Sequence, residues 1–341
     1  MKKLNKPNQF VHDISTWYKA NQRDLPFRRT KDPYRIWISE IMAQQTQMDT
    51  VVPYYERFIK RFPTVEALAS APLNEVLSLW EGLGYYRRAK HLHESAQIIA
   101  THHQGRFPDT LKEIKALKGV GEYTAAAIHS IAFNQPSPAV DGNVMRVMSR
   151  LLGYEKDIRQ TQSKQTITDV LKPVMIMGEP TVITQALMEL GALVCKKTPL
   201  CEECPVNDYC FAYKHNAVAH YPNLSKLKPK TTESYFTFVI YHKNHFLLIT
   251  RPNDGLLGGL LAFPQTQAKD LKNAINNVQL DDSLTLDNLD YKGKVSHTFT
   301  HKIWQMQVYA YESPTILTGM IDIDKKQNAL PKAHQKVLEL I

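Results

Sequence analysis

The segment LKGVGEYTA, residues 117–125, combines two glycines with a tyrosine at the start of an expected helix. Backbone N–H groups at a helix N-terminus lie at the positive end of the helix dipole, so Gly119 and Gly121 are typical of a seat for a phosphate group. Many helices that bind nothing also begin after glycine. Tyr123 lies on the first turn of this helix, where its phenol either serves chemistry or packs against the next helix.

All four cysteines lie within one 16-residue segment, CKKTPLCEECPVNDYC, at Cys195, Cys201, Cys204 and Cys210. Four thiolates in so short a loop favour ligation of a metal ion or cluster. A disulfide is the alternative, and it is disfavoured inside a cell. Zinc sites usually use two Cys-x-x-Cys pairs, and here only one such pair is present. The loop carries a rim of lysines, which favours a structural role with a contact to phosphate: Lys196, Lys197 and Lys214.

Composition limits the class of protein. The chain has 341 residues, a formal net charge of +9, 43% hydrophobic residues and 22% charged residues. Such a length favours two domains. An excess of Lys and Arg favours a polyanionic partner such as nucleic acid, although many basic proteins bind none. Because we find neither a long apolar run nor a signal peptide, we expect an intracellular, soluble protein. We also expect a monomer that is cytoplasmic and nucleoid-associated, as in bacteria.

Residues 1–221 have the periodicity of short helices. Apolar residues recur at spacings of three and four, for example Trp37, Ile38 and Ile41, and turn signals such as FPT, EGLG, RFPD and NQPSP interrupt the pattern. Residues 222–232, PNLSKLKPKTT, are basic and poor in apolar residues, which predicts a linker.

Residues 233–341 have a different pattern. The runs YFTFVIY, HFLLITR and KIWQMQVYAY are typical of strands, with a hairpin across HKN between the first two and a helix at residues 268–278. The chain is therefore predicted to be mainly α, with an all-helical first domain and an α+β second domain.

Five motifs resemble those of one family, in the family's order. They are ISEIMAQQTQ (38–47), WEGLGYYRRAK (80–90), GVGEYTA (119–125), VDGNVMRV (140–147) and the cysteine segment. Together they resemble the helix-hairpin-helix DNA glycosylases of the endonuclease III superfamily, and most closely the adenine DNA glycosylase (MutY) branch. The resemblance runs from about Arg23 to Cys210 and resumes in the second domain, where it implies a Nudix-like fold.

The resemblance gives Tyr123 a specific meaning. Bifunctional relatives carry a lysine at this position, whose amine attacks the sugar C1′, forms a Schiff base and cuts the strand. A phenol cannot form an imine. Tyr123 therefore predicts removal of a base without efficient strand cleavage.

Two catalytic carboxylates are also implied by the resemblance. Glu40 would protonate N7 of adenine, and its apolar helix face would raise its pKa. Asp141 would stabilise the oxocarbenium-like sugar, with Tyr123 and Asn143 holding both groups in place. From the residues alone, Glu40 is typical of a solvated helix surface and Asp141 of a helix N-cap. We predict a double displacement with retention, the two carboxyl groups being roughly 5–5.5 Å apart when substrate is bound.

The target adenine must leave the duplex to reach these groups. The resemblance implies an adenine pocket lined by Arg23, Arg28, Gln45 and Gln185. It implies a wedge beside the opposite base formed by Leu83 and Tyr85. Further DNA contacts are implied for Thr46, Gly119, Val120 and Gly121. Two residues depart from the family pattern: Phe27 replaces a tryptophan but still offers a ring, and Ala43 replaces a larger apolar residue.

In the second domain, RPNDGLLGGLLAFP (251–264) and HTFTHKIW (297–304) resemble the two signatures with which the family reads 8-oxoguanine opposite adenine. The family's Phe-Ser-His loop is Phe299, Thr300 and His301 here, and threonine keeps the hydroxyl. A plain hairpin with a polar tip is the alternative. The helix AKDLKNAINNV lacks the glutamates that hold Mg²⁺ in Nudix hydrolases, so we expect no pyrophosphatase activity.

The resemblance implies a [4Fe–4S] cluster bound by the four cysteines, although the first cysteine spacing is one residue shorter than is common. The implied partner is double-stranded DNA with adenine opposite 8-oxoguanine or guanine. Two alternatives stay open. One is a bifunctional glycosylase and AP lyase of the endonuclease III type, which Tyr123 disfavours. The other is a non-catalytic lesion-binding protein, which the presence of both carboxylates disfavours.

Overall fold

The computed structural model describes residues 4–226, 228–252, 255–278, 288–325 and 330–341. The chain divides into two compact units. The first comprises residues 1–70 and 91–226, and the second comprises residues 71–90 and 227–341. The second unit therefore includes a segment of 20 residues, 71–90, that lies far from the rest of it in the sequence.

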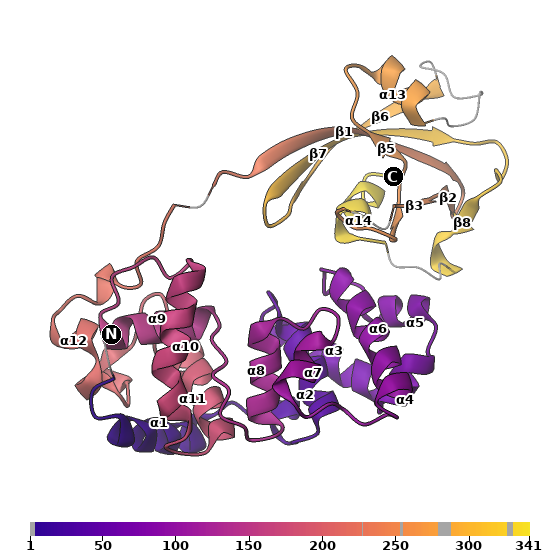
Figure 1. Ribbon diagram of the computed structural model, residues 1–341. Helices are drawn as coiled ribbons and strands as arrows, with labels where there is room; N and C mark the ends of the chain where they lie inside the picture. Colours follow the sequence, from indigo (N-terminus) through magenta and orange to yellow (C-terminus); the bar gives the residue numbers. More distant parts are fainter. Residues whose placement is uncertain (1–3, 227, 253–254, 279–287, 326–329) are drawn as a thin grey trace. The chain divides into compact units, whose positions relative to one another are not determined.

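The first unit is built from helices, as its periodicity predicts (Figure 1). Its helices and 3₁₀ turns are α1 (Pro7–Asn21), η1 (Pro26–Arg28), α2 (Pro33–Ala43), α3 (Met48–Arg61), α4 (Val65–Ser70), α6 (Arg87–His102, whose first residues belong to the second unit), α7 (Leu111–Ala116), α8 (Glu122–Ile131), α9 (Gly142–Leu152), α10 (Thr161–Met175), α11 (Pro180–Leu193), η2 (Cys201–Glu203), η3 (Asn207–Tyr209), α12 (Phe211–Lys214) and η4 (Val218–His220).

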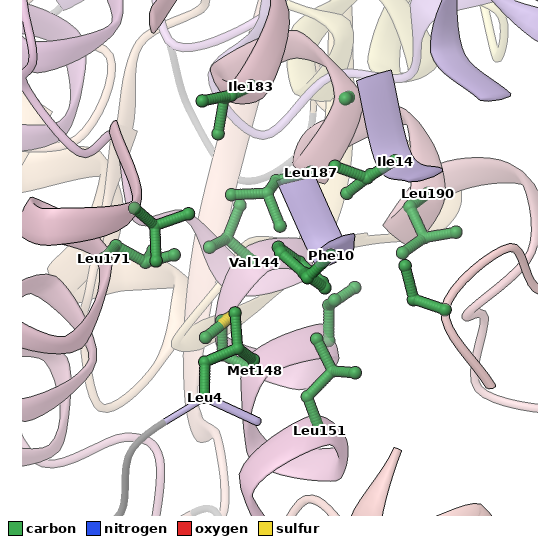
Figure 2. Close-up of a cluster of buried hydrophobic side chains, with 14 of the residues drawn as sticks. Leu4, Phe10, Ile14, Val144, Met148, Leu151, Leu171, Ile183, Leu187 and Leu190 are labelled. Carbon is green, nitrogen blue, oxygen red and sulfur yellow. The ribbon is translucent and has the colours of Figure 1, made fainter. Parts of the chain in front are cut away.

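One hydrophobic core holds α1, α9, α10 and α11 together. Figure 2 shows side chains from these helices meeting there, among them Phe10, Val144, Leu171 and Leu187. Each fully buried side chain of this size contributes about 1.5–3 kcal/mol relative to an exposed one. Helices α11 and α9 pack tightly, because a Cβ added at Gly191 would lie 2.7 Å from Cβ of Asn143. The core thus fixes the start of α9 against the end of α11.

A second group of helices is formed by α2, α3, α7 and α8. Helix α2 begins at an N-cap, Asp32, whose side chain accepts a hydrogen bond from the Tyr34 N–H at 2.9 Å. Most of α2 is buried, including Trp37 and Ile38. It contacts both α3 and α8. This burial places the C-terminal turn of α2 beside the first turn of α8.

Helices α7 and α8 form a helical hairpin around the predicted glycine turn. Gly121 is the N-cap of α8, as the sequence indicates. Gly119 has φ +75°, and a Cβ there would lie 2.9 Å from Cβ of His91, so only glycine fits without strain. The turn is closed by the Val120 N–H, which donates to the Leu117 carbonyl at 3.2 Å.

The second unit is an α+β structure. Its elements are α5 (Leu73–Leu79), β1 (Thr231–His242), β2 (His245–Leu247), β3 (Ile249–Thr250), β4 (Leu261–Ala262), β5 (Gln265–Thr266), α13 (Leu271–Val278), β6 (Asp290–Thr298), β7 (Lys302–Glu312), β8 (Met320–Asp322), η6 (Ile323–Lys325) and α14 (Lys332–Leu338). The main sheet has the order β6-β7-β1-β2-β8, with β5 also paired to β1, and β3 pairs with β4 in a separate ribbon. Strands β1 and β7 are parallel over eleven residue pairs, from Thr231↔Lys302 to Tyr241↔Glu312.

The strand predictions are partly right. The hairpin across HKN is confirmed, since His242 pairs with His245 and Lys243 takes φ +52° in the turn. The run HFLLITR is not one strand: it breaks at Leu248 into β2 and β3, which pair in different sheets. The sequence patterns also missed β6 and α14. Residues 253–254 of the first signature, and residue 227 of the linker, lie outside the described residues.

Among the described residues, we find no helix with both the length and the apolar character needed to cross a membrane.

Candidate active site

A cavity of about 1420 Å³ opens in the first unit. It is lined by every residue predicted for the catalytic and adenine-binding sets: Glu40, Asp141, Tyr123, Asn143, Arg23, Arg28, Gln45 and Gln185. These residues come from α2, α8, α9, α11 and the chain around η1. Helices distant in the sequence therefore deliver two carboxyl groups, a phenol and two guanidinium groups to one space.

Glu40 lies on the last turn of α2, next to buried Ile36 and Trp37. Burial raises the pKa of its carboxyl group to about 7, and the nearby charge of Asp141 acts in the same direction. A hydrogen bond from Tyr123 and the charge of Arg28 oppose this rise. An apolar setting thus leaves Glu40 about half protonated at neutral pH, as a general acid requires.

Asp141 is the N-cap of α9, as the sequence indicates. Its Oδ1 accepts from the Val144 N–H at 2.7 Å, and its Oδ2 accepts from Asn143 Nδ2 at 3.3 Å. Burial raises the pKa of Asp141, while these hydrogen bonds oppose the rise. The helix N-terminus and the capping bonds favour a carboxylate. Asp141 therefore caps α9 and also lies close enough to Glu40 to raise its pKa.

The charges of both carboxyl groups act on the phenol of Tyr123. Burial, followed by the charges of Glu40 and Asp141, raises the pKa of its phenol, so the phenol stays neutral. Its hydroxyl also lies 3.9 Å from the Met188 sulfur. The side chain faces the cavity, so packing on a neighbouring helix does not fully account for it.

Arg23 and Arg28 converge on a residue that the sequence patterns missed, Glu189 of α11. The Arg23 N–H, Nε and Nη2 all donate to Glu189 at 2.9 Å, and Arg28 Nη2 donates to it at 2.5 Å. Glu189 is 0% exposed. Burial alone would raise the pKa of Glu189, but the hydrogen bonds from both arginines outweigh it and lower that pKa to about 2. One buried carboxylate therefore orients both guanidinium groups at the cavity wall.

A signal for Glu189 exists in the sequence. It interrupts the apolar run ALMELGAL, and a charged residue at a buried helix position requires a partner. Sequence alone does not say which of the chain's arginines supplies it.

Most of the other first-unit residues predicted to contact adenine or DNA also line the cavity. Gln45 is exposed and takes φ +59° directly after α2, a left-handed conformation that is uncommon for glutamine. Gln185 donates to the Thr181 carbonyl at 3.3 Å. Thr46, Gly119 and Gly121 line the cavity, whereas Val120 is buried. Phe27 and Ala43 line it too.

A polar connection runs from the cavity to the cysteine loop. Arg146 Nη2 donates to Asn143 Oδ1 at 2.9 Å, and its Nε donates to the Cys195 carbonyl at 2.7 Å. Arg150, one turn later, is buried and donates from Nη1 to Cys195 Sγ at 3.3 Å. The sequence patterns missed both arginines, because their partner Cys195 lies 49 and 45 residues further along the chain.

No disulfide joins any of the four cysteines, so the disulfide alternative is wrong. Burial, together with the charges of the other three cysteines, raises the pKa of Cys204 to about 12 despite a backbone hydrogen bond. A positively charged metal centre reverses this cost, so the donor set fits metal ligation. In the part of the chain that the structure describes, no three His, Cys, Asp or Glu side chains are placed to share a single ion. A four-iron cluster instead places each thiolate on a different iron.

In the second unit the predicted wedge residues differ in exposure. Leu83 is 5% exposed, whereas Tyr85 is 47% exposed and takes φ +50°. The predicted loop lies at the tip of the β6–β7 hairpin, where the Phe299 N–H donates to the Lys302 carbonyl at 2.7 Å. Thr300 and His301 are exposed. The Tyr85 and Thr300 hydroxyl groups are hydrogen-bonded at 2.7 Å.

Family models match most of the chain. Residues 38–173 match the HhH-GPD superfamily base excision DNA repair protein. Residues 197–210 match the iron-sulfur binding domain of endonuclease III, and residues 236–340 match a NUDIX domain. The cysteine loop accordingly binds a [4Fe–4S] cluster.

Individual proteins agree with these matches. An "Adenine DNA glycosylase" of Buchnera aphidicola subsp. Baizongia pistaciae (strain Bp) is 35% identical over 321 residues, which cover 90% of each chain. An "Adenine DNA glycosylase" of Homo sapiens is 33% identical and covers 91% of this chain and 68% of its own length. A solved thermostable thymine-DNA glycosylase superimposes with a TM-score of 0.57 at 30% identity, over 62% of this chain and 98% of its own. The chain belongs to the adenine DNA glycosylase family, and it is a DNA N-glycosylase of base excision repair.

Proposed function

We propose that this enzyme, acting as a monomer, removes adenine paired with 8-oxoguanine or guanine from double-stranded DNA. We propose further that it is monofunctional and retains configuration at C1′. The observation that carries the proposal is that Glu40 and Asp141 line one cavity together with Tyr123. The pKa of Glu40 is about 7 there.

In the first step, the bond between C1′ and N9 breaks and its electron pair stays with the adenine. Glu40 donates its proton to N7, so the base leaves neutral. Asp141, ionised, stabilises the positive charge that develops on the sugar and bonds to C1′ from the opposite face. The hydrogen bonds that α9 and Asn143 donate to Asp141 keep its oxygens oriented toward the cavity.

In the second step, Glu40, now a carboxylate, takes a proton from water. The water oxygen bonds to C1′ as the bond to Asp141 breaks, which returns both carboxyl groups to their starting states. Two inversions give net retention. The neutral phenol of Tyr123 assists by hydrogen bonding to Glu40.

Strand cleavage needs an amine that forms an imine with C1′, and Tyr123 provides none. Three lysines do line the cavity: Lys164, Lys196 and Lys197. Lys196 and Lys197 are exposed in the cysteine loop, which suits contacts to phosphate groups. The start of α8 suits the same purpose, because its N-cap, Gly121, has no side chain to occupy the first N–H groups.

This proposal assigns recognition of the opposite base to Tyr85, Phe299, Thr300 and His301. It assigns residues 1–221 to the glycosylase domain, apart from the segment 71–90 that belongs to the second unit, and residues 233–341 to the recognition domain. The ring of Phe299 packs edge-on against Trp304 with centroids 4.8 Å apart, which supports the hairpin tip. The exposed Thr300 hydroxyl is suited to hydrogen bonding with a modified purine.

The test uses duplexes with one adenine opposite 8-oxoguanine, guanine or thymine. We expect strand breaks only after hot alkali, a faster rate with 8-oxoguanine than with guanine, and no reaction with thymine. Methanolysis in place of hydrolysis should give the retained anomer. Breaks without alkali, or a covalent complex trapped by borohydride, would indicate the bifunctional alternative. Tyr123→Lys serves as a positive control for imine formation.

A further inference from the structure

Side-chain hydrogen bonds join the segment 71–90 to the rest of the second unit. Tyr85 Oη and Thr300 Oγ1 are 2.7 Å apart. Lys90 Nζ donates to the Gly258 carbonyl at 2.9 Å. Gln335 Nε2, on α14, donates to Glu81 Oε1 at 3.0 Å. The exposed Tyr85 thus lies between two anchored ends, Glu81 and Lys90.

The first part of the chain between these anchors, residues 81–86, which we term the wedge turn, is held by several internal contacts. Trp80 Nε1 donates to the Gly84 carbonyl at 3.0 Å, and the Gly82 N–H donates to Tyr86 Oη at 3.3 Å. The guanidinium carbon of Arg88 lies 5.3 Å from the ring centroids of both Trp80 and Tyr85. These contacts brace the turn internally.

The anchor on α14 has a fixed orientation. Gln335 Nε2 carries two hydrogens: one is donated to the Leu330 carbonyl at 2.8 Å, and the other to Glu81. The bond to Leu330 ties the amide group to the chain just before α14, so the second hydrogen points in one direction. The acceptor is a carboxylate, which makes this bond stronger than a neutral one.

We propose that Gln335 is a positioning residue for recognition of the base opposite the adenine. It holds Glu81, and through the wedge turn it holds the Tyr85 ring beside the Thr300 hydroxyl, so that ring and hydroxyl meet the base together. The inference rests on the proposed function, which assigns recognition to Tyr85 and Thr300. It adds that the discrimination depends on α14, whose residues lie outside both recognition motifs of the sequence.

The test compares single-turnover rates on adenine opposite 8-oxoguanine and opposite guanine. Gln335→Leu removes both donors at similar volume. We expect it to lower the ratio of the two rates by about three- to tenfold, which lies within the range for one typical intramolecular hydrogen bond, with the rate opposite guanine unchanged. Glu81→Ala removes the acceptor instead and should lower the ratio to the same extent. It replaces Gln335→Leu in the test if the leucine variant does not fold.

Two variants serve as controls. Glu81→Gln keeps an oxygen acceptor and should keep the ratio within about twofold of the wild type. Gln165→Leu removes a glutamine–carboxylate hydrogen bond of equal length, 3.0 Å to Asp169, in the first unit, and should leave the ratio unchanged.

An unchanged ratio in folded Gln335→Leu overturns the inference, and so does an equal fall of both rates, which indicates a structural role only. If the wild type itself does not distinguish 8-oxoguanine from guanine, the recognition part of the proposed function fails and the inference fails with it. If the wild type discriminates between the two bases and both Gln335→Leu and Glu81→Ala keep that discrimination, the inference fails and the proposed function stands.

Discussion

The pH dependence of adenine release follows from the environment of Glu40. With a pKa of about 7, Glu40 is about half protonated at pH 7, whereas a carboxyl group at the ordinary 4.5 would be protonated in about one molecule in 300. Burial therefore supplies about 150 times more of the acid form at neutral pH. The rate should fall about tenfold between pH 6 and pH 8 and about tenfold per unit above that.

Tyr123 changes this profile in a defined direction. Its hydrogen bond lowers the pKa of Glu40, so Tyr123→Phe should move the alkaline limb to higher pH. At low pH the rate should fall again as Asp141, whose pKa is also raised, gains a proton. The profile is expected to be bell-shaped.

The assay measures single-turnover rates at enzyme concentrations below saturation, because these report on groups of the free enzyme. DNA binding is measured at each pH by anisotropy, so that a change in affinity is not taken for a change in chemistry. Glu40→Gln is the control and should bind DNA without releasing adenine. A flat profile between pH 6 and pH 9, or a limb that Tyr123→Phe moves to lower pH, refutes the assignment of Glu40 as the acid.

Three further predictions concern stability and the cluster. The pKa of Glu40 is raised in the folded state, so the folded protein loses stability as the pH rises from about 4.5 through about 7 and Glu40 ionises. Glu40→Gln should therefore stabilise the fold by about 3 kcal/mol at pH 9 and by little at pH 4.5, as measured by urea unfolding. Equal gains at both pH values would contradict this. Glu189→Ala leaves two arginines without their buried partner and should lower the free energy of unfolding by about 3–5 kcal/mol. Asp24→Ala breaks the exposed pair with Arg29 and should leave the urea midpoint nearly unchanged. Similar losses in both variants would be inconsistent with the burial argument. Arg150→Met removes the hydrogen bonds donated to Cys195 Sγ and to the carbonyls of Lys196 and Lys197. The purified variant should therefore hold less iron per chain, as measured by elemental analysis. A full iron content would count against this role of Arg150.

Local patterns were sufficient for much of the fold. Helical periodicity and turn residues predicted the short helices of the first unit, since each amphipathic segment carries its own period and its own breakers. Short strands were harder. HFLLITR reads as one strand, yet it divides at Leu248, because the partners of β2 and β3 lie in different sheets. Pairing partners are set by contacts distant in the chain, which a local pattern does not contain.

For the site, the sequence determined the chemical identity of its groups: carboxyls at 40 and 141, a phenol at 123 and four thiols in one loop. Only the tertiary structure decided their state. Burial beside Ile36 and Trp37 raises the pKa of Glu40, and the choice of Glu189 as the common partner of Arg23 and Arg28 depends on α11 meeting the chain before α2. The tertiary structure likewise decided that residues 71–90 belong with the second unit, because solvation and contact depend on neighbours that are remote in sequence.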